Sequence, residues 1–242
     1  MLSIIIPTLN EEKNIGKLLD CILSQSMGKQ VEIIVVDCKS DDSTEEIVKK
    51  YQKNNSFIKL VVSDIRGVSH QRNLGAENAS NEKLLFLDAD ALLPEGFLEE
   101  NLKEINKRNL GTAGCYVLPM SDKMVDKIYH ETLNFWLWLM QVVYPHMPGF
   151  CIFSTKEIHK SLNGFDKTIK LAEDNDYVNR SKKITKFRML NSKRIWCSVR
   201  RFNKEGYITT GIKYILCPIY RILFGEIRSD IFKYRFGHYE NK

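Results

Sequence analysis

The first half of the chain alternates short apolar runs with amphipathic segments. Four apolar runs predict strands, at residues 3–6, 31–36, 58–62 and 84–87. Between them lie three predicted helices. The first covers residues 11–25, the second follows the polar loop 37–43 and runs through Tyr51, and the third covers 68–79. Asn10 is the expected N-cap of the first helix, and Glu11 and Glu12 suit its first turn. Continuous apolar strands alternating with helices predict an α/β domain whose mostly parallel sheet is covered by helices on both faces.

The pattern is less regular after residue 110. A strand is expected over 112–118, and the aromatic-rich stretch 133–144 is shorter than the roughly 20 residues that cross a bilayer. Near the C-terminus, isoleucines recur at helical spacing, and Pro218 should kink the helix they predict. An apolar stripe with basic flanks can lie on a membrane surface, although packing on the sheet is the more common arrangement. We expect a main domain over 1–202, with halves of about 1–118 and 119–202, and a basic amphipathic helical extension over 203–242.

Charge is distributed unevenly. The net charge of +6 combines a front part, residues 1–154, with 16 basic and 21 acidic side chains, and a back part with 20 basic and 9 acidic side chains. A basic segment can meet nucleic acid, an anionic membrane or an anionic substrate. Because the sequence contains no recognisable nucleic-acid-binding module, we expect one of the last two, although a solvated basic surface would look the same.

The six cysteines are dispersed, without the paired spacing of zinc or redox sites. Such cysteines are typical of a reducing compartment, where they serve as small buried apolar residues. The N-terminus begins directly with a strand-like run and shows no signal-peptide pattern. We therefore expect a cytoplasmic protein.

Acidic side chains follow three of the four predicted strands. Ligands on parallel sheets bind beyond the carboxyl ends of the strands, so these loops form the expected site. Asp88 and Asp90, separated by one residue, come directly after the strand 84–87. Two such carboxylates suit Mg²⁺ or Mn²⁺, which in turn bridge phosphate oxygens. The alternative is that they only cap a helix beginning near Pro94.

Four motifs resemble, in the same order, those of the inverting glycosyltransferases of family 2, which have the GT-A fold. They are residues 4–12 (IIIPTLNEE), 35–44 (VVDCKSDDST), 71–75 with 84–90 (QRNLG, LLFLDAD), and 162–166 with 173–176 (LNGFD, EDND). Together they cover the chain from residue 2 to about residue 180 and are far more specific than any one alone. The resemblance implies a GT-A type α/β fold, a nucleotide-sugar donor such as a UDP- or GDP-sugar, and Mn²⁺ or Mg²⁺ as cofactor.

The resemblance also implies roles for single residues. Pro7, Glu11 and Asp37 would line the nucleoside pocket. Asp88 would contact the ribose or the metal, and Asp90 would bind the metal. Asp174, of the pair Glu173-Asp174, would take the proton from the acceptor. These roles compete with plain structural ones, because acidic residues are also favoured in the first turn of a helix.

Basic residues are candidates for contacts with phosphate. Arg66 and Arg72 are placed to contact the nucleotide or its phosphates, and Arg200 and Arg201 could reach a diphosphate. Surface ion pairs or a solvated basic face would explain the same residues.

Two positions depart from the family pattern. Cys38 stands where a second acid usually reads the base, so the identity of the base is open. Lys39 replaces a common glycine, which should narrow or re-aim that loop.

The resemblance favours the transfer of a hexose-type sugar with inversion. A base such as Asp174 is needed for a hydroxyl acceptor, on a growing glycan or a lipid-linked saccharide, and less so for an ionised polyprenyl phosphate. A polyprenyl-phosphate sugar transferase and a non-catalytic nucleotide-sugar-binding protein remain alternatives. A phosphatase that uses the first aspartate of Asp-x-Asp is disfavoured, because such enzymes place that motif after the first strand. A sugar nucleotidyltransferase is disfavoured because no glycine-rich phosphate loop follows residues 3–6.

Overall fold

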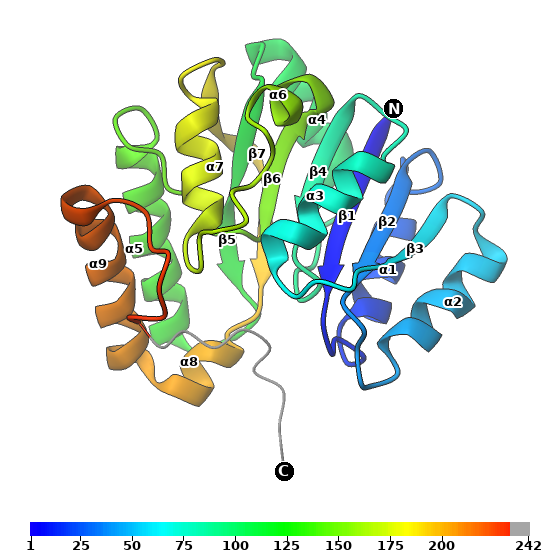
Figure 1. Cartoon of the computed structure of the whole chain (residues 1–242), viewed down its shortest axis with the longest axis horizontal. Coiled ribbons are helices and arrows are strands. Elements are labelled where there is room, and N and C mark those ends of the chain that lie inside the picture. Colours follow the sequence, from blue (N-terminus) through cyan, green and yellow to red (C-terminus); the bar gives the residue numbers. More distant parts are fainter. Residues whose placement is uncertain (233–242) are drawn as a thin grey trace.

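The computed structural model describes residues 1–232, and in this part of the chain seven strands form one mixed sheet (Figure 1). Their order across the sheet is β3-β2-β1-β4-β6-β5-β7. The strands are β1 (Leu2–Thr8), β2 (Glu32–Asp37), β3 (Ile58–Val62), β4 (Lys83–Leu87), β5 (Thr112–Pro119), β6 (Cys151–Thr155) and β7 (Phe187–Cys197).

The half of the sheet formed by β1 to β4 is parallel, as predicted. Strand β1 lies between β2 and β4, and β2 also pairs with β3. The register places Thr8 opposite Asp37, so the loops that follow β1 and β2 start side by side. The expected site loops therefore lie at one edge of the sheet.

The other half of the sheet is built differently. Strand β6 runs antiparallel to both β4 and β5, while β7 runs parallel to β5. Neither β6 nor β7 was predicted from the sequence. β6 has only five residues, and β7 carries a polar stretch at Asn191–Arg194 that breaks its apolar pattern.

Helices cover the sheet on both faces (Figure 1). They are α1 (Ile15–Leu23), α2 (Thr44–Asn54), α3 (Val68–Asn78), α4 (Phe97–Arg108), α5 (Met124–Met140), α6 (Lys156–Ser161), α7 (Glu173–Ser181), α8 (Arg200–Glu205) and α9 (Tyr207–Phe224). The predicted Asn10 cap is wrong, since α1 begins only at Ile15. Asn10 has a left-handed φ of 55°, and its side chain accepts a hydrogen bond from the Asp41 backbone N–H. It therefore holds the neighbouring loop and does not start the helix.

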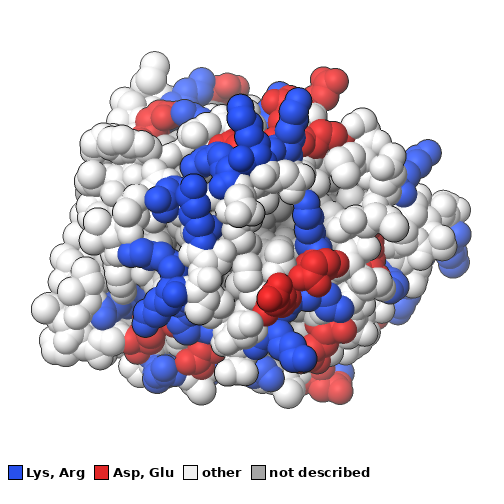
Figure 2. Space-filling view, turned by 90° about the horizontal axis from the view of Figure 1, so that it is seen from above, with Lys and Arg blue, Asp and Glu red and all other residues white. Residues whose placement is uncertain are grey.

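The amino ends of β1 to β4 lie on the face shown in Figure 2, which looks down on Figure 1 from above. Lys and Arg side chains gather around the middle of this face. The left flank, where Figure 1 places α5 and α9, carries little charge in this view. The basic surface and the carboxyl ends of the strands are thus at opposite ends of the sheet.

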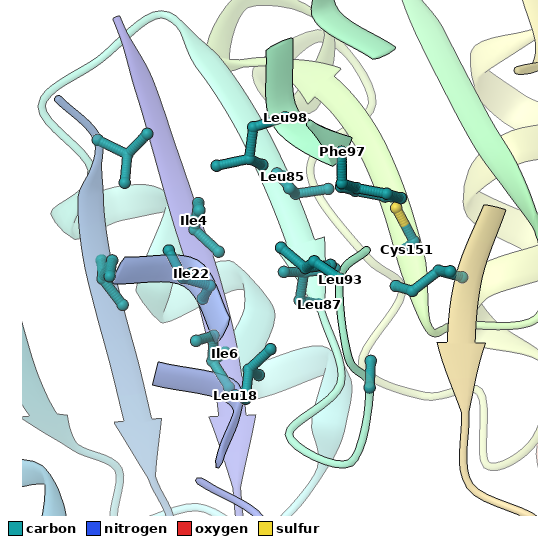
Figure 3. Close-up of a cluster of buried hydrophobic side chains, with 14 of the residues drawn as sticks. Ile4, Ile6, Leu18, Ile22, Leu85, Leu87, Leu93, Phe97, Leu98 and Cys151 are labelled. Atoms are coloured by element: carbon teal, nitrogen blue, oxygen red, sulfur yellow. The ribbon is translucent and has the colours of Figure 1, made fainter. Parts of the chain in front are cut away.

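Side chains of β1 alternate between two apolar layers. Ile4 and Ile6 point into a layer covered by α1 and α4, whose Leu18 and Phe97 pack there (Figure 3). Ile5 belongs to the layer on the opposite face, under α3 and α7. Because both faces are buried, the strands read as continuous apolar runs rather than as alternating ones.

The C-terminal helices continue the main domain. The predicted boundary at residue 203 falls inside α8, and α9 runs on through Pro218 to Phe224. Residues 233–242 of the predicted extension lie outside the described part of the chain. Within residues 1–232, no helix has the length and apolar character needed to cross a bilayer.

Candidate active site

Arg72 on α3 occupies the centre of the site. Its side chain is 2% exposed. Its Nη1 donates to Glu173 Oε1 and its Nη2 to Asp88 Oδ1, both at 2.9 Å, and Nη2 also reaches the Gly149 carbonyl at 3.1 Å. The guanidinium carbon lies 5.2 Å from the centre of the Phe165 ring. One buried cation therefore joins the end of β4 to the start of α7.

Asp88 and Asp90 follow β4 and are both partly exposed, by 29% and 13% of their side chains. Burial raises the pKa of Asp88 to about 6, and the charge of Asp90 adds to this shift while Arg72 opposes it. The two carboxylates follow β4 with one residue between them. The alternative role as helix caps is not what the structure shows, because α4 starts only at Phe97, with Gly96 as its N-cap.

Arg200 on α8 bridges Asp90 and Glu11. Its Nη2 lies 3.0 Å from Asp90 Oδ2 and 3.1 Å from Glu11 Oε1. Burial raises the pKa of Glu11 to about 6, while Arg200 opposes the shift. The structure thus brings Arg200 to two of the predicted site carboxylates, and a contact of Arg200 or Arg201 with a diphosphate stays a prediction.

Asp174 lies in the first turn of α7. Its Oδ1 accepts from the Asn175 backbone N–H at 2.7 Å. A Cβ atom at Gly149 would lie 3.1 Å from Asp174 Oδ2 and 2.6 Å from Arg72 Nη2, so the chain passes very close to both groups. Burial, followed by repulsion from Glu173, raises the pKa of Asp174 to about 8. Glu173 is the member of the pair that Arg72 binds, which leaves Asp174 as the candidate base.

The residue before this pair has a strained backbone. Ala172, the N-cap of α7, has a left-handed φ of 66°. This conformation costs a residue with a Cβ about 1–2 kcal/mol. Such strain clusters at functional sites, where the surrounding structure enforces it.

The loop after β2 is organised by Asp37, which is fully buried. Its oxygens accept from the Thr8 hydroxyl at 2.8 Å, the Ser40 N–H at 2.8 Å and the Ser40 hydroxyl at 2.6 Å. Pro7 lies beside it in β1, opposite Val36. The structure thus shows Asp37 holding the loop expected to bind the nucleoside, and a direct contact of Asp37 or Pro7 with a base stays a prediction.

The two departures from the family pattern have structural consequences. Lys39 has a left-handed φ of 50°, the conformation that favours glycine, and its ammonium pairs with Asp64 at 2.6 Å. This ion pair links the loop after β2 to the loop after β3, which carries the exposed Arg66. Cys38 is buried, and burial raises the pKa of its thiol. Lys39 therefore adopts a backbone conformation that suits the glycine it replaces, and a narrowed or re-aimed loop stays a prediction.

Two residues of α3 position the site although the sequence did not single them out. Gln71 Nε2 donates to the carbonyls of Thr8 and Val36 at 2.7 and 2.8 Å, which ties α3 to the ends of β1 and β2. Asn73 exchanges two hydrogen bonds with the backbone of Phe165, at 2.9 and 2.8 Å. Both are sequence neighbours of Arg72 and belong to the motif of residues 71–75, so the family resemblance already pointed to these positions.

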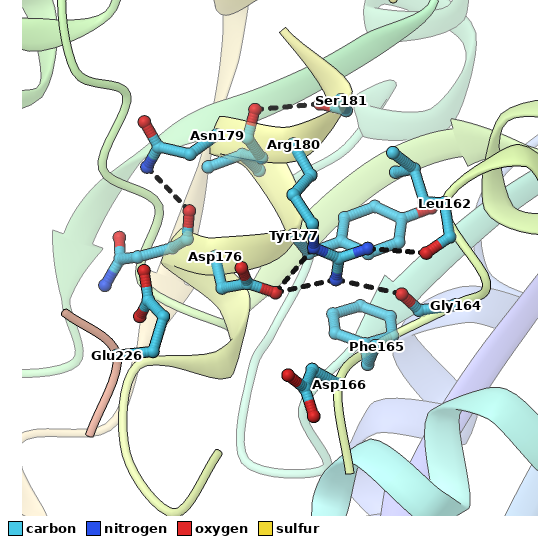
Figure 4. Close-up of polar contacts among 12 residues, drawn as sticks. Leu162, Gly164, Phe165, Asp166, Asp176, Tyr177, Asn179, Arg180, Ser181 and Glu226 are labelled. Atoms are coloured by element: carbon cyan, nitrogen blue, oxygen red, sulfur yellow. Dashed lines mark hydrogen bonds and ion pairs between the residues drawn. The ribbon is translucent and has the colours of Figure 1, made fainter. Parts of the chain in front are cut away.

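Arg180 secures the loop of the LNGFD motif to α7 (Figure 4). It donates to the carbonyls of Leu162 and Gly164 at 2.7 and 2.9 Å and pairs with Asp176. The rings of Phe165 and Tyr177 stack below it, with centres 4.2 Å apart. Asp176 is therefore a structural member of the acidic motif.

The chain after α9 returns to the same loop. Ile227 forms an antiparallel bridge with Leu171, and Arg228 Nη1 lies 2.9 Å from Asp166 Oδ2. These contacts attach the C-terminal helices to the segment directly before Glu173. The chain directly after α9 consequently borders the segment that leads into α7.

The carboxylates after β4 suit a hard divalent cation. Among residues 1–232, no three His, Cys, Asp or Glu side chains are grouped as metal ligands. Mg²⁺, however, is usually held by one or two carboxylates together with substrate phosphates, and does not need a complete protein cage. Asp88 and Asp90 therefore fit such an ion.

The family model for glycosyl transferase family 2 matches residues 3–158 of the chain. The chain belongs to glycosyltransferase family 2. One curated family relative is the dolichyl N-acetyl-alpha-D-glucosaminyl phosphate 3-beta-D-2,3-diacetamido-2,3-dideoxy-beta-D-glucuronosyltransferase of Methanococcus voltae, 29% identical over 73% of this chain and 60% of its own length. Another is the GalNAc(5)-diNAcBac-PP-undecaprenol beta-1,3-glucosyltransferase of Campylobacter jejuni, 34% identical over 44% of this chain and 35% of its own length. This family member thus spans 60% or less of the length of these two relatives.

Solved structures show that this family 2 chain has the GT-A fold. Residues 1–349 of S. aureus TarS, in complex with UDP, match with a TM-score of 0.68 and 21% identity, over 90% of this chain and 65% of that one. The mannosyltransferase PcManGT from Pyrobaculum calidifontis, in complex with GDP-Man and Mn²⁺, matches with a TM-score of 0.68 and 24% identity, over 88% of this chain and 60% of its own. The predicted GT-A fold and the resemblance to family 2 are confirmed.

Six of the predicted site residues form one connected group in this family 2 structure. They are Glu11, Arg72, Asp88, Asp90, Glu173 and Asp174. Pro7 and Asp37 lie in the adjacent loop region, at the ends of β1 and β2. Arg66 is exposed in the loop after β3.

Proposed function

We propose that this protein transfers a hexose-type sugar from a UDP- or GDP-sugar to a hydroxyl group, with inversion at the anomeric carbon. The observation that carries the proposal is the position of Arg72. It holds a donor-side carboxylate, Asp88, and an acceptor-side carboxylate, Glu173, at 2.9 Å each, so the two halves of a transfer site share one fixed centre.

The donor would lie over the carboxyl ends of β1, β2 and β4, with the nucleoside near Pro7, Glu11 and Asp37. Mn²⁺ or Mg²⁺ bound by Asp90, with Asp88 beside it, would neutralise charge on the departing diphosphate. Arg200 lies within 3.0 Å of Asp90 and can add a second positive charge at the same place. Fixed charges aimed at the leaving group stabilise the transition state without reorganisation.

The acceptor would approach from the side of α7. Asp174 takes the proton of the acceptor hydroxyl while the acceptor oxygen forms a bond to C1 of the sugar. The bond from C1 to the diphosphate oxygen breaks at the same time, and the nucleoside diphosphate leaves with the electron pair. Attack opposite to the leaving group inverts the anomeric centre. A base whose pKa is raised toward the working pH is a stronger proton acceptor, which suits Asp174.

The acceptor class follows from the same argument. A hydroxyl needs the base that Asp174 supplies, whereas an ionised polyprenyl phosphate does not. The curated relatives described above are named for lipid-linked saccharide acceptors. We therefore infer a glycan or lipid-linked saccharide as the acceptor, at a membrane surface on the cytoplasmic side.

Thermal unfolding in the presence of UDP- and GDP-sugars, with and without Mn²⁺, tests the donor class. A true donor raises the melting temperature, because it binds only the folded protein, and should do so more with Mn²⁺. Release of the nucleoside diphosphate with a saccharide acceptor then tests for turnover. Stabilisation without release under any acceptor would support the non-catalytic alternative.

A further inference from the structure

Helix α5 buries a polar face. Asp126, His130 and Asn134 are all less than 5% exposed, although they lie on a helix at the rim of the molecule. Asp126 accepts hydrogen bonds from the hydroxyls of Ser121 and Tyr207 at 2.6 and 2.9 Å, and Asn134 bonds both the N–H and the carbonyl of Val117 at 2.9 Å. The inward face of α5 is therefore held by hydrogen bonds more than by apolar packing.

Helix α9 has the same unusual arrangement. Its buried residues are Thr210 and Arg221. Arg221 donates to both oxygens of Glu226, at 2.7 and 2.8 Å, and lies over the ring of Tyr144, 5.4 Å from its centre. The face of α9 turned to the domain is thus polar as well.

Both helices turn apolar side chains to the outside. Trp138 on α5 is 56% exposed and Ile215 on α9 is 64% exposed. The remaining exposed apolar residues of α5 and the turn after it are Met124, Val125, Ile128, Phe135, Trp136, Leu139, Val142 and Val143. Those of α9 are Ile208, Ile212, Leu216, Ile219, Ile222, Leu223 and Phe224. An ordinary surface helix has the opposite polarity, with its apolar face toward the core.

The two apolar faces form one surface, because the helices lie side by side and run in the same direction (Figure 1). Contacts join them along their length. Tyr207 reaches Asp126 near their starts, and the rings of Tyr129 and Tyr214 lie 6.5 Å apart further along. We call this surface, formed by the exposed apolar residues of α5, the turn after it and α9, the outer apolar face. Contiguous exposed apolar surfaces of this kind mark interaction sites.

Charge and composition favour a lipid surface as its occupant. α9 contains no Asp or Glu. Lysines flank the outer apolar face, with the exposed Lys123, Lys127 and Lys204 at the starts of the helices. The half-buried Lys182, which donates to the Val143 carbonyl, lies at the far end. Lysine is depleted in protein–protein interfaces but common beside apolar faces that lie on anionic membranes. Tryptophan, present at 136 and 138, is enriched at the membrane–water interface.

α9 also lies close to the proposed catalytic base. Ile227, in the segment directly after α9, forms an antiparallel bridge with Leu171, three residues before Asp174. The end of α9 is therefore tied to the segment that leads into α7, whose first turn carries Asp174.

We propose that the outer apolar face docks on an anionic lipid bilayer, with α5 and α9 lying in the interface and the inner side of α9 facing the acceptor side of the site. A saccharide anchored in that bilayer would then reach Asp174 past the edge of α9. The docking itself needs no catalysis; only this last consequence rests on the proposed function.

Co-sedimentation with vesicles tests the surface. The full chain should bind phosphatidylglycerol–phosphatidylcholine vesicles, and bind pure phosphatidylcholine vesicles several-fold more weakly, with added salt reducing the difference. The pair Ile215→Asp and Ile219→Asp on α9, and Trp138→Asp on α5, should each reduce binding to the anionic vesicles at least about tenfold. Ile65→Asp changes a 55% exposed isoleucine in the loop after β3, at the opposite edge of the sheet. This variant is the matched control and should bind vesicles like the unaltered protein.

Several results would overturn the proposal. One is that the unaltered protein does not bind the anionic vesicles. Another is that the α9 pair or Trp138→Asp binds them as well as the unaltered protein does. A third is that Ile65→Asp loses as much vesicle binding as the α9 pair. A concentration-dependent dimer that the α9 pair abolishes, without vesicle binding, would show that a second copy covers the face instead. Donor binding by thermal shift checks that each variant folds. Vesicle binding without sugar transfer would count against the proposed function and leave the docking surface standing.

Discussion

Arg72 and Glu173 are 101 residues apart in the sequence, yet Arg72 Nη1 lies 2.9 Å from Glu173 Oε1 inside the protein. The same guanidinium holds Asp88, so it fixes the spacing between the donor side and the acceptor side of the site. Phe165 and the Gly149 carbonyl complete its surroundings. This single residue is therefore the part of the structure on which the proposed chemistry most depends.

Arg72→Met should strongly destabilise the fold. Removing one partner of a buried ion pair leaves an uncompensated charge and costs about 3–5 kcal/mol. Urea unfolding measures the change in the free energy of unfolding. Arg194→Met is the control, because Arg194 is half exposed and pairs with Glu131 at the surface, where such pairs contribute about 0–1 kcal/mol. Similar losses in both variants would contradict the central role of Arg72.

Asp174→Asn should abolish transfer but leave donor binding within about twofold. Losing a general base typically costs about 10²–10⁴ in rate, while the nucleotide lies on the other side of Arg72. Initial rates and calorimetric titration with the donor measure the two effects. Asp20→Asn is the control and should transfer normally. Asp20 is an exposed aspartate on α1 that accepts a hydrogen bond from the Tyr51 hydroxyl. Near-normal transfer by Asp174→Asn would remove Asp174 from the mechanism.

Transfer should depend on pH through Asp174. Its pKa is raised, so the carboxyl is protonated and inactive as a base at lower pH, and kcat/KM should rise with pH until it levels off near the pKa of about 8. Initial rates between pH 5.5 and 9.5 measure this limb. A profile that is flat across this range would be incompatible with the assignment.

A stability measurement checks the same pKa without turnover. Because the folded pKa lies above the unfolded value, the ionised Asp174 destabilises the fold increasingly as pH rises between those two values. Asp174→Asn should therefore raise the melting temperature relative to the unaltered protein, more at pH 9 than at pH 5. The opposite trend would mean that the native site favours the ionised form.

Gly149→Ala should impair the site by crowding. The new methyl group would lie 2.6 Å from Arg72 Nη2 and 3.1 Å from Asp174 Oδ2. Arg72 cannot move away from it without breaking its hydrogen bond to Asp88. We expect at least a tenfold loss in kcat and a destabilisation of about 1–3 kcal/mol, as for other overpacked positions. Gly211→Ala is the control, since a Cβ there meets nothing within 4 Å and alanine favours α9. Unchanged activity of Gly149→Ala would show that Arg72 and Asp174 are free to move.

Asp90→Ala should remove the effect of Mn²⁺ on nucleotide binding. Asp90 lies at the end of β4, 3.0 Å from Arg200, where a cation can be shared between a carboxylate and the diphosphate. Titration calorimetry with UDP or GDP, with and without Mn²⁺, gives the comparison. Asp41→Ala, an exposed acid of the adjacent loop, is a suitable control. A metal effect of the same size in Asp90→Ala would disprove the ligand assignment.

The local elements of the donor half were predictable from the sequence. The runs around Ile5, Ile34 and Leu85 specify strands because both faces are buried, and parallel pairing brings their carboxyl ends together by a general rule of such sheets. The order of the four motifs then identified the family and the fold. What the sequence determined by itself was therefore the architecture and the set of candidate groups.

The tertiary structure alone decided how those groups are paired. The sequence does not show that Arg72 forms an ion pair with Glu173, which leaves Asp174 as the candidate base. Nor does it show that Arg200 forms ion pairs with both Asp90 and Glu11. It also left open whether the apolar stripe of α9 packs on the sheet or lies on a membrane surface, because periodicity fixes which residues share a face but not which face is buried. The structure turns this stripe outward, against the more common packed arrangement. Burial and charge pairing are properties of segments far apart in the chain, and only their packing in three dimensions sets them.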